Sequence, residues 1–188
     1  MFLDNNLMAM PTVALQQVTN PFARRNAKGT LEKPIHLKYI QRFLVDVEIR
    51  QALELVCEKG TVYIWGAKLE RLSQSFKMFP RQCLFLFRQG GQINRVGVLS
   101  ESIVSLELAE KLWGMDGDGE TWGLIFFFRE MIELSIPASE INSILGFREN
   151  NHWQGLIAKS SPEADEVIKY IKGERARQLG RMTLGNRD

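Results

Sequence analysis

Two tryptophans at the ends of apolar runs are the residues of this sequence best placed to form a ligand site. The run 62–68 delivers Trp65 and Gly66 at its end, and the run 122–128 begins with Trp122. A strand that carries a tryptophan at its end, with glycine beside the ring, leaves open space next to a flat aromatic surface. The pattern predicts a pocket for a flat ligand, while burial of the same rings in the core is the alternative.

The size and charge of the chain limit the number of domains and the classes of partner that the sequence allows. With 188 residues, 45% of them hydrophobic, the chain is long enough for one domain with its own core, plus tails. A formal net charge of +2 neither indicates nor excludes a nucleic-acid partner. No apolar run approaches the ~20 residues of a membrane span, and the first residues lack the pattern of a signal peptide. We expect a cytoplasmic protein without a membrane partner.

Catalytic and metal-binding patterns are missing from the sequence. Cys57, Cys83, His36 and His152 each lie far from a second metal ligand, so neither a metal nor another cofactor is expected. There is no phosphate-binding glycine loop, nucleophile elbow or zinc-protease motif. The loop 114–120 is acidic, but it lacks the spacing of a calcium site and a lysine partner in sequence of the kind a nuclease needs. We expect a binding module with no catalytic residues.

The order of predicted elements favours an α/β or α+β fold. Tail-like segments are predicted at both ends: an arm over residues 1–34, whose basic stretch 23–28 is either solvated or a phosphate contact, and a basic linker over 173–188. Between them, apolar periodicity and turn residues predict strands at 39–47, 61–65, 82–88, 93–99 and 122–128, and helices at 48–59, 69–76, 106–112, 138–146 and 162–173, with an irregular segment at 147–157.

This succession of elements resembles the PUA-like superfamily, in particular its EVE and YTH branches. A helix precedes the strand that ends at Trp65, a hairpin follows, and a loop with a tryptophan leads to the strand 124–128 and the helix that opens at Pro137. The resemblance implies a mixed β-barrel with flanking helices over residues 35–172. It also implies binding of a modified base in an aromatic cage, as in the EVE-like modules of McrB-type restriction proteins.

Site residues follow from the resemblance position by position. It implies a cage of Trp65, Trp113 and Trp122, base-edge contacts by Gly66 and Gln51, and contacts to the nucleic-acid backbone by Lys68, Arg148 and Lys159. Leu55 departs from the family pattern, because an amide side chain is expected near it on the preceding helix.

The function implied is recognition of a methylated base, with N6-methyladenine favoured, flipped out of DNA in a modification-dependent restriction system. A GTPase or nuclease module would then lie outside this chain. Two alternatives stay open: a reader of N6-methyladenosine or another RNA-binding protein of the same fold, and a protein-interaction adaptor in which the tryptophans belong to the core.

Overall fold

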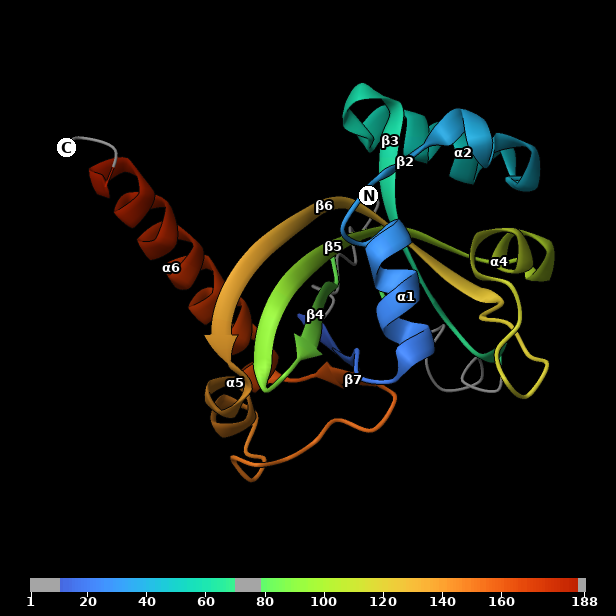
Figure 1. The fold of residues 1–188 in the computed structure, drawn as a ribbon. Coiled ribbons are helices and arrows are strands. Elements are labelled where there is room, and N and C mark those ends of the chain that lie inside the picture. The colour runs from blue at the N-terminus through green and yellow to red at the C-terminus, as the bar shows by residue number, and fades with distance from the viewer. Residues whose placement is uncertain (1–10, 70–78, 186–188) are drawn as a thin grey trace, which may run out of the picture.

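One strongly curved β-sheet organises the part of the chain that the computed structural model describes, residues 11–69 and 79–185. Its seven strands lie in the order β2-β3-β6-β5-β4-β1-β7, and the sheet curls without closing into a barrel (Figure 1). The strands are β1 (Thr12–Gln17), β2 (Ile35–His36), β3 (Thr61–Ala67), β4 (Leu84–Gln89), β5 (Gln92–Val104), β6 (Leu124–Pro137) and β7 (Leu156–Ser160). The helices are α1 (Pro21–Thr30), α2 (Val47–Val56), α4 (Leu106–Trp113), α5 (Ala138–Ile144) and α6 (Pro162–Gly185), with 3₁₀ turns η1 (Leu37–Tyr39), η2 (Gln41–Phe43) and η3 (Glu58–Gly60).

The curvature of the sheet comes from its two longest strands, β5 and β6. Their antiparallel register shifts next to Leu99, and such irregularities bend a strand and increase its twist. Close to this point the Phe128 ring packs over Gly97, because a Cβ atom on Gly97 would lie 2.8 Å from Cδ1 of Phe128. Glycine at position 97 therefore leaves room for this ring, in agreement with the close approach that a glycine in the middle of a strand indicates.

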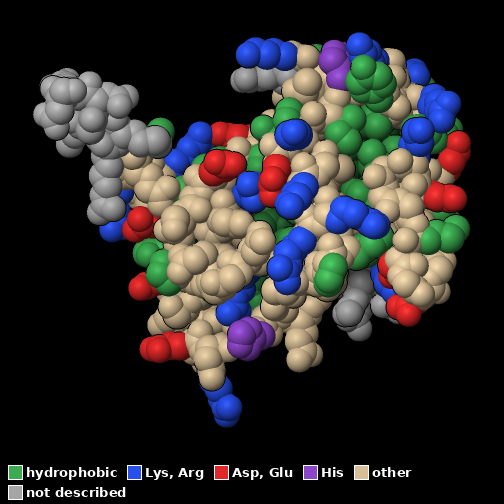
Figure 2. Space-filling model, viewed as in Figure 1, with side chains coloured by type: hydrophobic (Ala, Val, Ile, Leu, Met, Phe, Trp, Pro, Cys, Tyr) green, Lys and Arg blue, Asp and Glu red, His purple; other side chains and the backbone are tan. Residues whose placement is uncertain are grey.

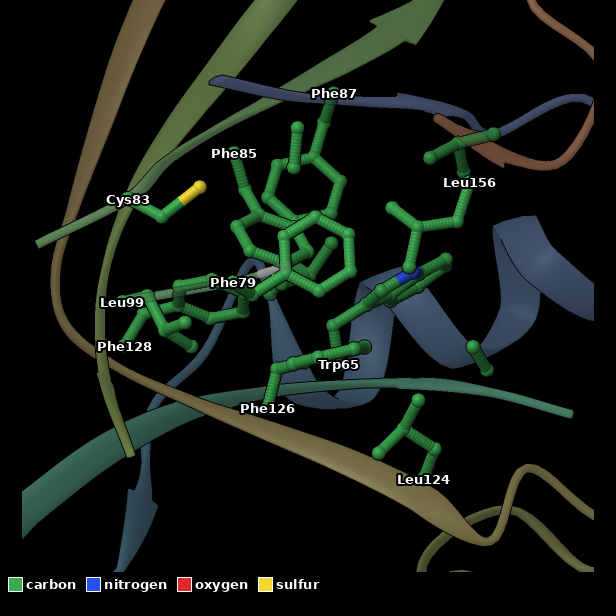
Figure 3. Packing of buried hydrophobic residues seen from close by; sticks show 14 of the residues in the cluster. Trp65, Phe79, Cys83, Phe85, Phe87, Leu99, Leu124, Phe126, Phe128 and Leu156 are labelled. Atoms are coloured by element: carbon green, nitrogen blue, oxygen red, sulfur yellow. The ribbon is translucent and has the colours of Figure 1, made fainter. Parts of the chain in front are cut away.

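The concave side of the sheet encloses an aromatic core. Figure 3 shows the rings of Trp65 of β3, Phe85 and Phe87 of β4, and Phe126 of β6 pointing toward one another. Helix α1 lies across the open side of the curl and contributes Ala23, Ala27 and the following Leu31 to the same cluster (Figure 1). The convex side is covered by α5 and α6 at one end and by α2 and α4 at the other.

Most of the predicted elements are present, and the predicted mixed α/β architecture with flanking helices is confirmed. The strand that delivers Trp65 is β3, the predicted hairpin is β4 and β5, and the run after Trp122 is β6. The helix predicted after Ser105 is α4, and the Ser105 hydroxyl accepts a hydrogen bond from the Leu108 amide at 3.2 Å. The helix predicted over 69–76 lies largely outside the described residues.

The prediction of a loosely attached arm over residues 1–34 is wrong for residues 12–31. Strand β1 pairs in parallel with β4 and antiparallel with β7, and Val13, Ala14 and Leu15 are fully buried. Pro11 and Pro21, which lie on the two sides of β1, suggest a loop, but they mark the limits of a short strand. Because both partners of β1 are distant in sequence, local pattern could not reveal the pairing.

The strand predicted over 39–47 is also wrong. The segment forms the successive 3₁₀ turns η1 and η2. Its buried residues Leu37, Ile40 and Phe43 are three positions apart, which is the spacing that places side chains on one side of a 3₁₀ helix. The apolar and aromatic residues of this segment therefore form the buried side of 3₁₀ turns that pack against α2.

Two predictions near the C-terminus need correction. The segment 147–157 is not irregular throughout, because β7 begins at Leu156 within it. The last helix does not end at Gly173 but continues to Gly185, because an isolated glycine costs a helix only about 1 kcal/mol relative to alanine. The segment predicted as a linker is thus helical as far as Gly185, and Arg175 forms an ion pair with Glu130 of β6 at 2.6 Å. In the described parts of the chain, no helix is long and apolar enough to cross a membrane.

Candidate nucleic-acid interface

A pocket of about 310 Å³ opens in the gap between the two ends of the curled sheet. Strand β2 pairs with Thr61 and Val62, and among the described residues no strand pairs with the same edge of β3 beyond them, so this edge faces the β1 and β7 side of the gap. Residues from both sides and from the start of α1 line the pocket: Gln16, Gln17, Thr19, Asn20, Gly66, Ala67, Lys68, Trp122, Trp153, Gly155 and Leu156. Its volume lies at the lower end of the roughly 300–1,000 Å³ typical of small-molecule sites.

Trp122 is the partly exposed tryptophan at this pocket, and other aromatic rings hold it from behind. The ring centre of Trp65 lies 4.8 Å from that of Trp122, that of Trp113 lies 5.7 Å away, and Phe22 makes an edge contact at 5.1 Å. Trp65 is 0% exposed and Trp113 is 5% exposed. The three predicted cage residues therefore do form one cluster, but in this conformation only Trp122 has ring surface that a ligand could touch.

Gly66 is required by the packing of this cluster. A Cβ atom at position 66 would lie 2.5 Å from Cζ3 of Trp113 and 2.8 Å from Cβ of Trp122. Both distances are shorter than van der Waals contact, so any side chain here would displace the two rings. Gly66 also lines the pocket, and its small size is what lets Trp122 sit against β3.

Gln16 places an amide on the inner face of the sheet, at the edge of the pocket. Ala14 and Val18 face the aromatic core, and alternation along β1 puts Gln16 on the same side. Its Nε2 donates to the carbonyl of Gln17 at 2.8 Å, which leaves Oε1 without a partner among the described residues. Gln16 is absent from the predicted site because the sequence pattern assigns β1 to the arm. If a strand had been predicted over residues 12–18, the alternation of side chains would have placed the polar Gln16 among inward-facing apolar residues.

Lys68 lines the pocket but is held by carboxylates of the loop 114–120. Its Nζ lies 2.5 Å from Glu120, 2.9 Å from Asp116 and 3.7 Å from Asp118. Hydrogen bonds to Glu120 and then to Asp116 raise the pKa of Lys68, and the bond to Lys68 lowers the pKa of Asp116. These acids lack a lysine near them in sequence, but the fold brings Lys68 to them from the end of β3. In the described chain no three His, Cys, Asp or Glu residues are grouped so as to hold a metal.

The loop before β7 reaches the pocket through Trp153, which is 1% exposed. Its Nε1 donates to Oδ1 of the buried Asn142 at 2.8 Å, and the guanidinium of Arg88 lies 5.7 Å from the ring centre. The Asn142 amide in turn donates to the carbonyls of Glu149 and Asn151. These bonds fix the loop, and hence one wall of the pocket, against α5.

The other predicted site residues do not line the pocket. Gln51 is exposed on α2, on the convex side of the sheet, and Arg148 is exposed in the loop that follows α5. Lys159 lies on β7 with its Nζ 4.8 Å from the ring centre of Phe147, which packs in the core beneath α5 and α6. Alternation along β7 puts Lys159 on the face opposite to Leu156.

An open, strongly curved mixed sheet with helices on its outer face fits the PUA-like fold predicted from the sequence. Among solved structures, the chain is similar to the N-terminal domain of Thermococcus gammatolerans McrB bound to m5C DNA. The TM-score is 0.62 at 16% sequence identity, over 85% of this chain and 98% of that chain. This similarity confirms the fold predicted from the sequence. No protein-family model matches the chain, and no curated protein matches it in sequence.

Proposed function

We propose that this protein binds a methylated base of DNA, turned out of the duplex and inserted into the pocket beside Trp122. One observation carries the proposal: the gap of the sheet holds a pocket lined by a partly exposed tryptophan, Trp122, and by the inward amide of Gln16. The structurally similar domain is bound to m5C DNA, which agrees with this assignment. A pocket in a sheet cannot reach a base inside a duplex, so the base must leave the stack.

Stacking on Trp122 would offset much of the free energy needed to turn the base out of the duplex. Extruding a base costs a few kcal/mol, and stacking on an aromatic side chain returns about 1–3 kcal/mol. We assign the stacking surface to Trp122, whereas Trp65 and Trp113 act as its rigid support through the ring contacts described above. A ring held from behind loses little entropy on binding, so more of its stacking energy is retained.

The unpaired Oε1 of Gln16 is the group best placed to read the edge of the base. As an acceptor it suits an exocyclic amino group, which adenine carries at N6 and cytosine at N4. We therefore assign to Gln16 the contact that the sequence resemblance gives to Gln51. We favour methylated cytosine over the N6-methyladenine favoured from sequence, because the structurally similar domain is bound to m5C DNA.

A methyl group contributes modestly on its own. Transfer of one methyl to an apolar environment is worth about 0.8 kcal/mol, or about fourfold in affinity. Leu156 and Ala67 supply apolar surface at the pocket. A preference much above fourfold would come from the shape of the pocket.

In this role the chain is the sensing part of a modification-dependent restriction system and not its enzyme. Cleavage and nucleotide hydrolysis would be the work of a separate GTPase or nuclease module.

A protein-interaction adaptor is the second candidate. The burial of Trp65 and Trp113 is what that alternative predicts, and two apolar residues near α2 are largely exposed, Val45 at 89% and Leu55 at 86%. The adaptor hypothesis assigns no role to the pocket, so binding experiments separate the two functions.

The test is a titration of methylated and unmethylated duplex DNA with three variants. Trp122→Ala should lose about 1–3 kcal/mol of binding, and Gln16→Leu should lose about 1 kcal/mol, or about fivefold, for the methylated duplex. Gln51→Leu is the matched control and should bind as the wild type does. Circular dichroism and thermal unfolding establish that each variant is folded.

Normal binding by folded Trp122→Ala and Gln16→Leu would reject the pocket as the base site. Loss of binding by Gln51→Leu alone would restore the assignment made from sequence. Preference for methylated RNA over DNA would move the protein to the RNA-reader alternative.

A further inference from the structure

Helix α1 follows the pocket residues Thr19 and Asn20, and its N-terminal half carries two consecutive arginines, Arg24 and Arg25, whose side chains take different directions. The Arg24 side chain turns back along the helix, and its Nε donates to the Thr19 carbonyl at 2.7 Å. Thr19 itself lines the pocket. This bond leaves the two terminal amino groups of the Arg24 guanidinium without a partner in the described chain, and they form the fork that suits a phosphate.

Arg25 lies next to the aromatic residues that support Trp122. Its guanidinium carbon lies 4.9 Å from the ring centre of Phe22, and its Nη2 donates to the Trp113 carbonyl at 3.4 Å. Phe22 is the ring that makes the edge contact with Trp122. Arg25 is therefore fixed by the aromatic support of the pocket, and its Nε and Nη1 have no partner within the described residues.

The charges around these arginines favour an anion. Helix α1 carries Arg24, Arg25 and Lys28, all exposed, and no Asp or Glu. No carboxylate pairs with any of the three within the described residues. Figure 2 shows Lys and Arg side chains gathered over the middle of this face, where α1 lies. Lys68, by contrast, already contacts three carboxylates and is poorly available to a phosphate.

From this arrangement, and building on the function proposed above, we infer that Arg24 and Arg25 hold the phosphates on the two sides of the inserted nucleotide. Arg24 binds on the Thr19 side of the pocket and Arg25 on the Trp122 side. A base that leaves the stack pulls its backbone toward the protein, so the phosphates next to it are the ones a rim can reach. The arginines would thus position the strand, and the pocket would read the base.

The experiment measures binding of duplex DNA, with and without m5C, by fluorescence anisotropy over a series of salt concentrations. The variants are Arg24→Gln, Arg25→Gln and the corresponding lysine variants. Arg42→Gln is the matched control, because Arg42 is also exposed and its guanidinium carbon lies 4.6 Å from the ring centre of Phe43, away from the pocket.

Each glutamine variant should reduce the slope of log K against log salt by about 0.9, which amounts to about eightfold weaker binding at 0.1 M salt. The loss should be equal for methylated and unmethylated DNA, because phosphate contacts carry no base information. The lysine variants should recover the slope, and Arg42→Gln should match the wild type.

Unchanged slopes for folded Arg24→Gln and Arg25→Gln, with the methyl preference of the wild type intact, would overturn the arginine assignment and leave the proposed function standing. A wild type that binds no nucleic acid would overturn both. A selective loss for methylated DNA alone would also reject the phosphate role.

Discussion

Substitution of Gly66 by alanine gives a direct test of how the aromatic cluster is packed. The new Cβ would lie 2.5 Å from Cζ3 and 2.7 Å from Cη2 of Trp113, and 2.8 Å from Cβ of Trp122. The Trp113 ring is buried and its Nε1 is 3.4 Å from the Thr30 hydroxyl, so it has little room to move. The Trp122 Cβ is close to the backbone, and it can move only if the chain moves.

Overpacking of this kind costs about 1–3 kcal/mol. For a protein of this size, each kcal/mol lowers the melting temperature by about 2–4 °C, so Gly66→Ala should melt about 2–12 °C below the wild type. Because Trp122 is displaced, the preference for methylated DNA should weaken as well.

The assay is chemical and thermal unfolding, with Gly117→Ala as the matched control. A Cβ at Gly117 meets nothing within 4 Å, and its backbone angle is accessible to alanine. The control should unfold like the wild type. Equal stability of Gly66→Ala and Gly117→Ala would refute the close packing of Trp113 and Trp122 against Gly66.

Three further predictions follow from other parts of the structure. Asn142→Ala removes the acceptor of the Trp153 indole and the donor to two backbone carbonyls, so the free energy of unfolding should fall by about 2–4 kcal/mol in urea titrations; an unchanged midpoint would contradict that network. Asp116→Asn frees Lys68 in part, so binding of unmodified DNA should strengthen and its salt dependence steepen; weaker binding would show that the loop does not restrain Lys68. Burial raises the pKa of Cys83 from 9.0 to about 12, so the stability that its neutral thiol provides is complete below pH 9 and is lost as the pH rises toward 12; Cys83→Ala should lack this part of the alkaline decline in unfolding free energy.

Local sequence pattern is sufficient for elements whose partners are near in sequence. The hairpin β4–β5 and the helix after Ser105 carry their own turn and capping signals. Strand β1 carries no such signal, because its two partners are β4 and β7 and its identity depends on long-range pairing. The segment 39–47 was predicted as a strand but forms 3₁₀ turns for another reason. Its β-branched and aromatic residues are compatible with both structures, so residue type alone could not decide between them.

The site was only partly predictable for similar physical reasons. The position of Trp65 at a strand end beside Gly66 predicted a ring next to a pocket, and the structure places that ring inside a buried aromatic cluster behind Trp122. Which ring of that cluster is exposed depends on the curl of the sheet, which turns Trp65 inward and leaves Trp122 at the gap. The ion pairs of Lys68 depend on where the loop 114–120 folds back, so sequence could not show that this cation is already engaged.

The most direct test of the proposed function is one titration of the wild-type protein at fixed salt. Duplexes of one sequence would be unmodified or would carry m5C or N6-methyladenine, and a single-stranded RNA with and without N6-methyladenosine would be measured beside them. We expect a methylated duplex to bind at least about fourfold more tightly than the unmodified one, and Trp122→Ala to remove the difference. Equal affinity for every duplex would contradict the central claim that the pocket in the gap of the sheet reads a modified base.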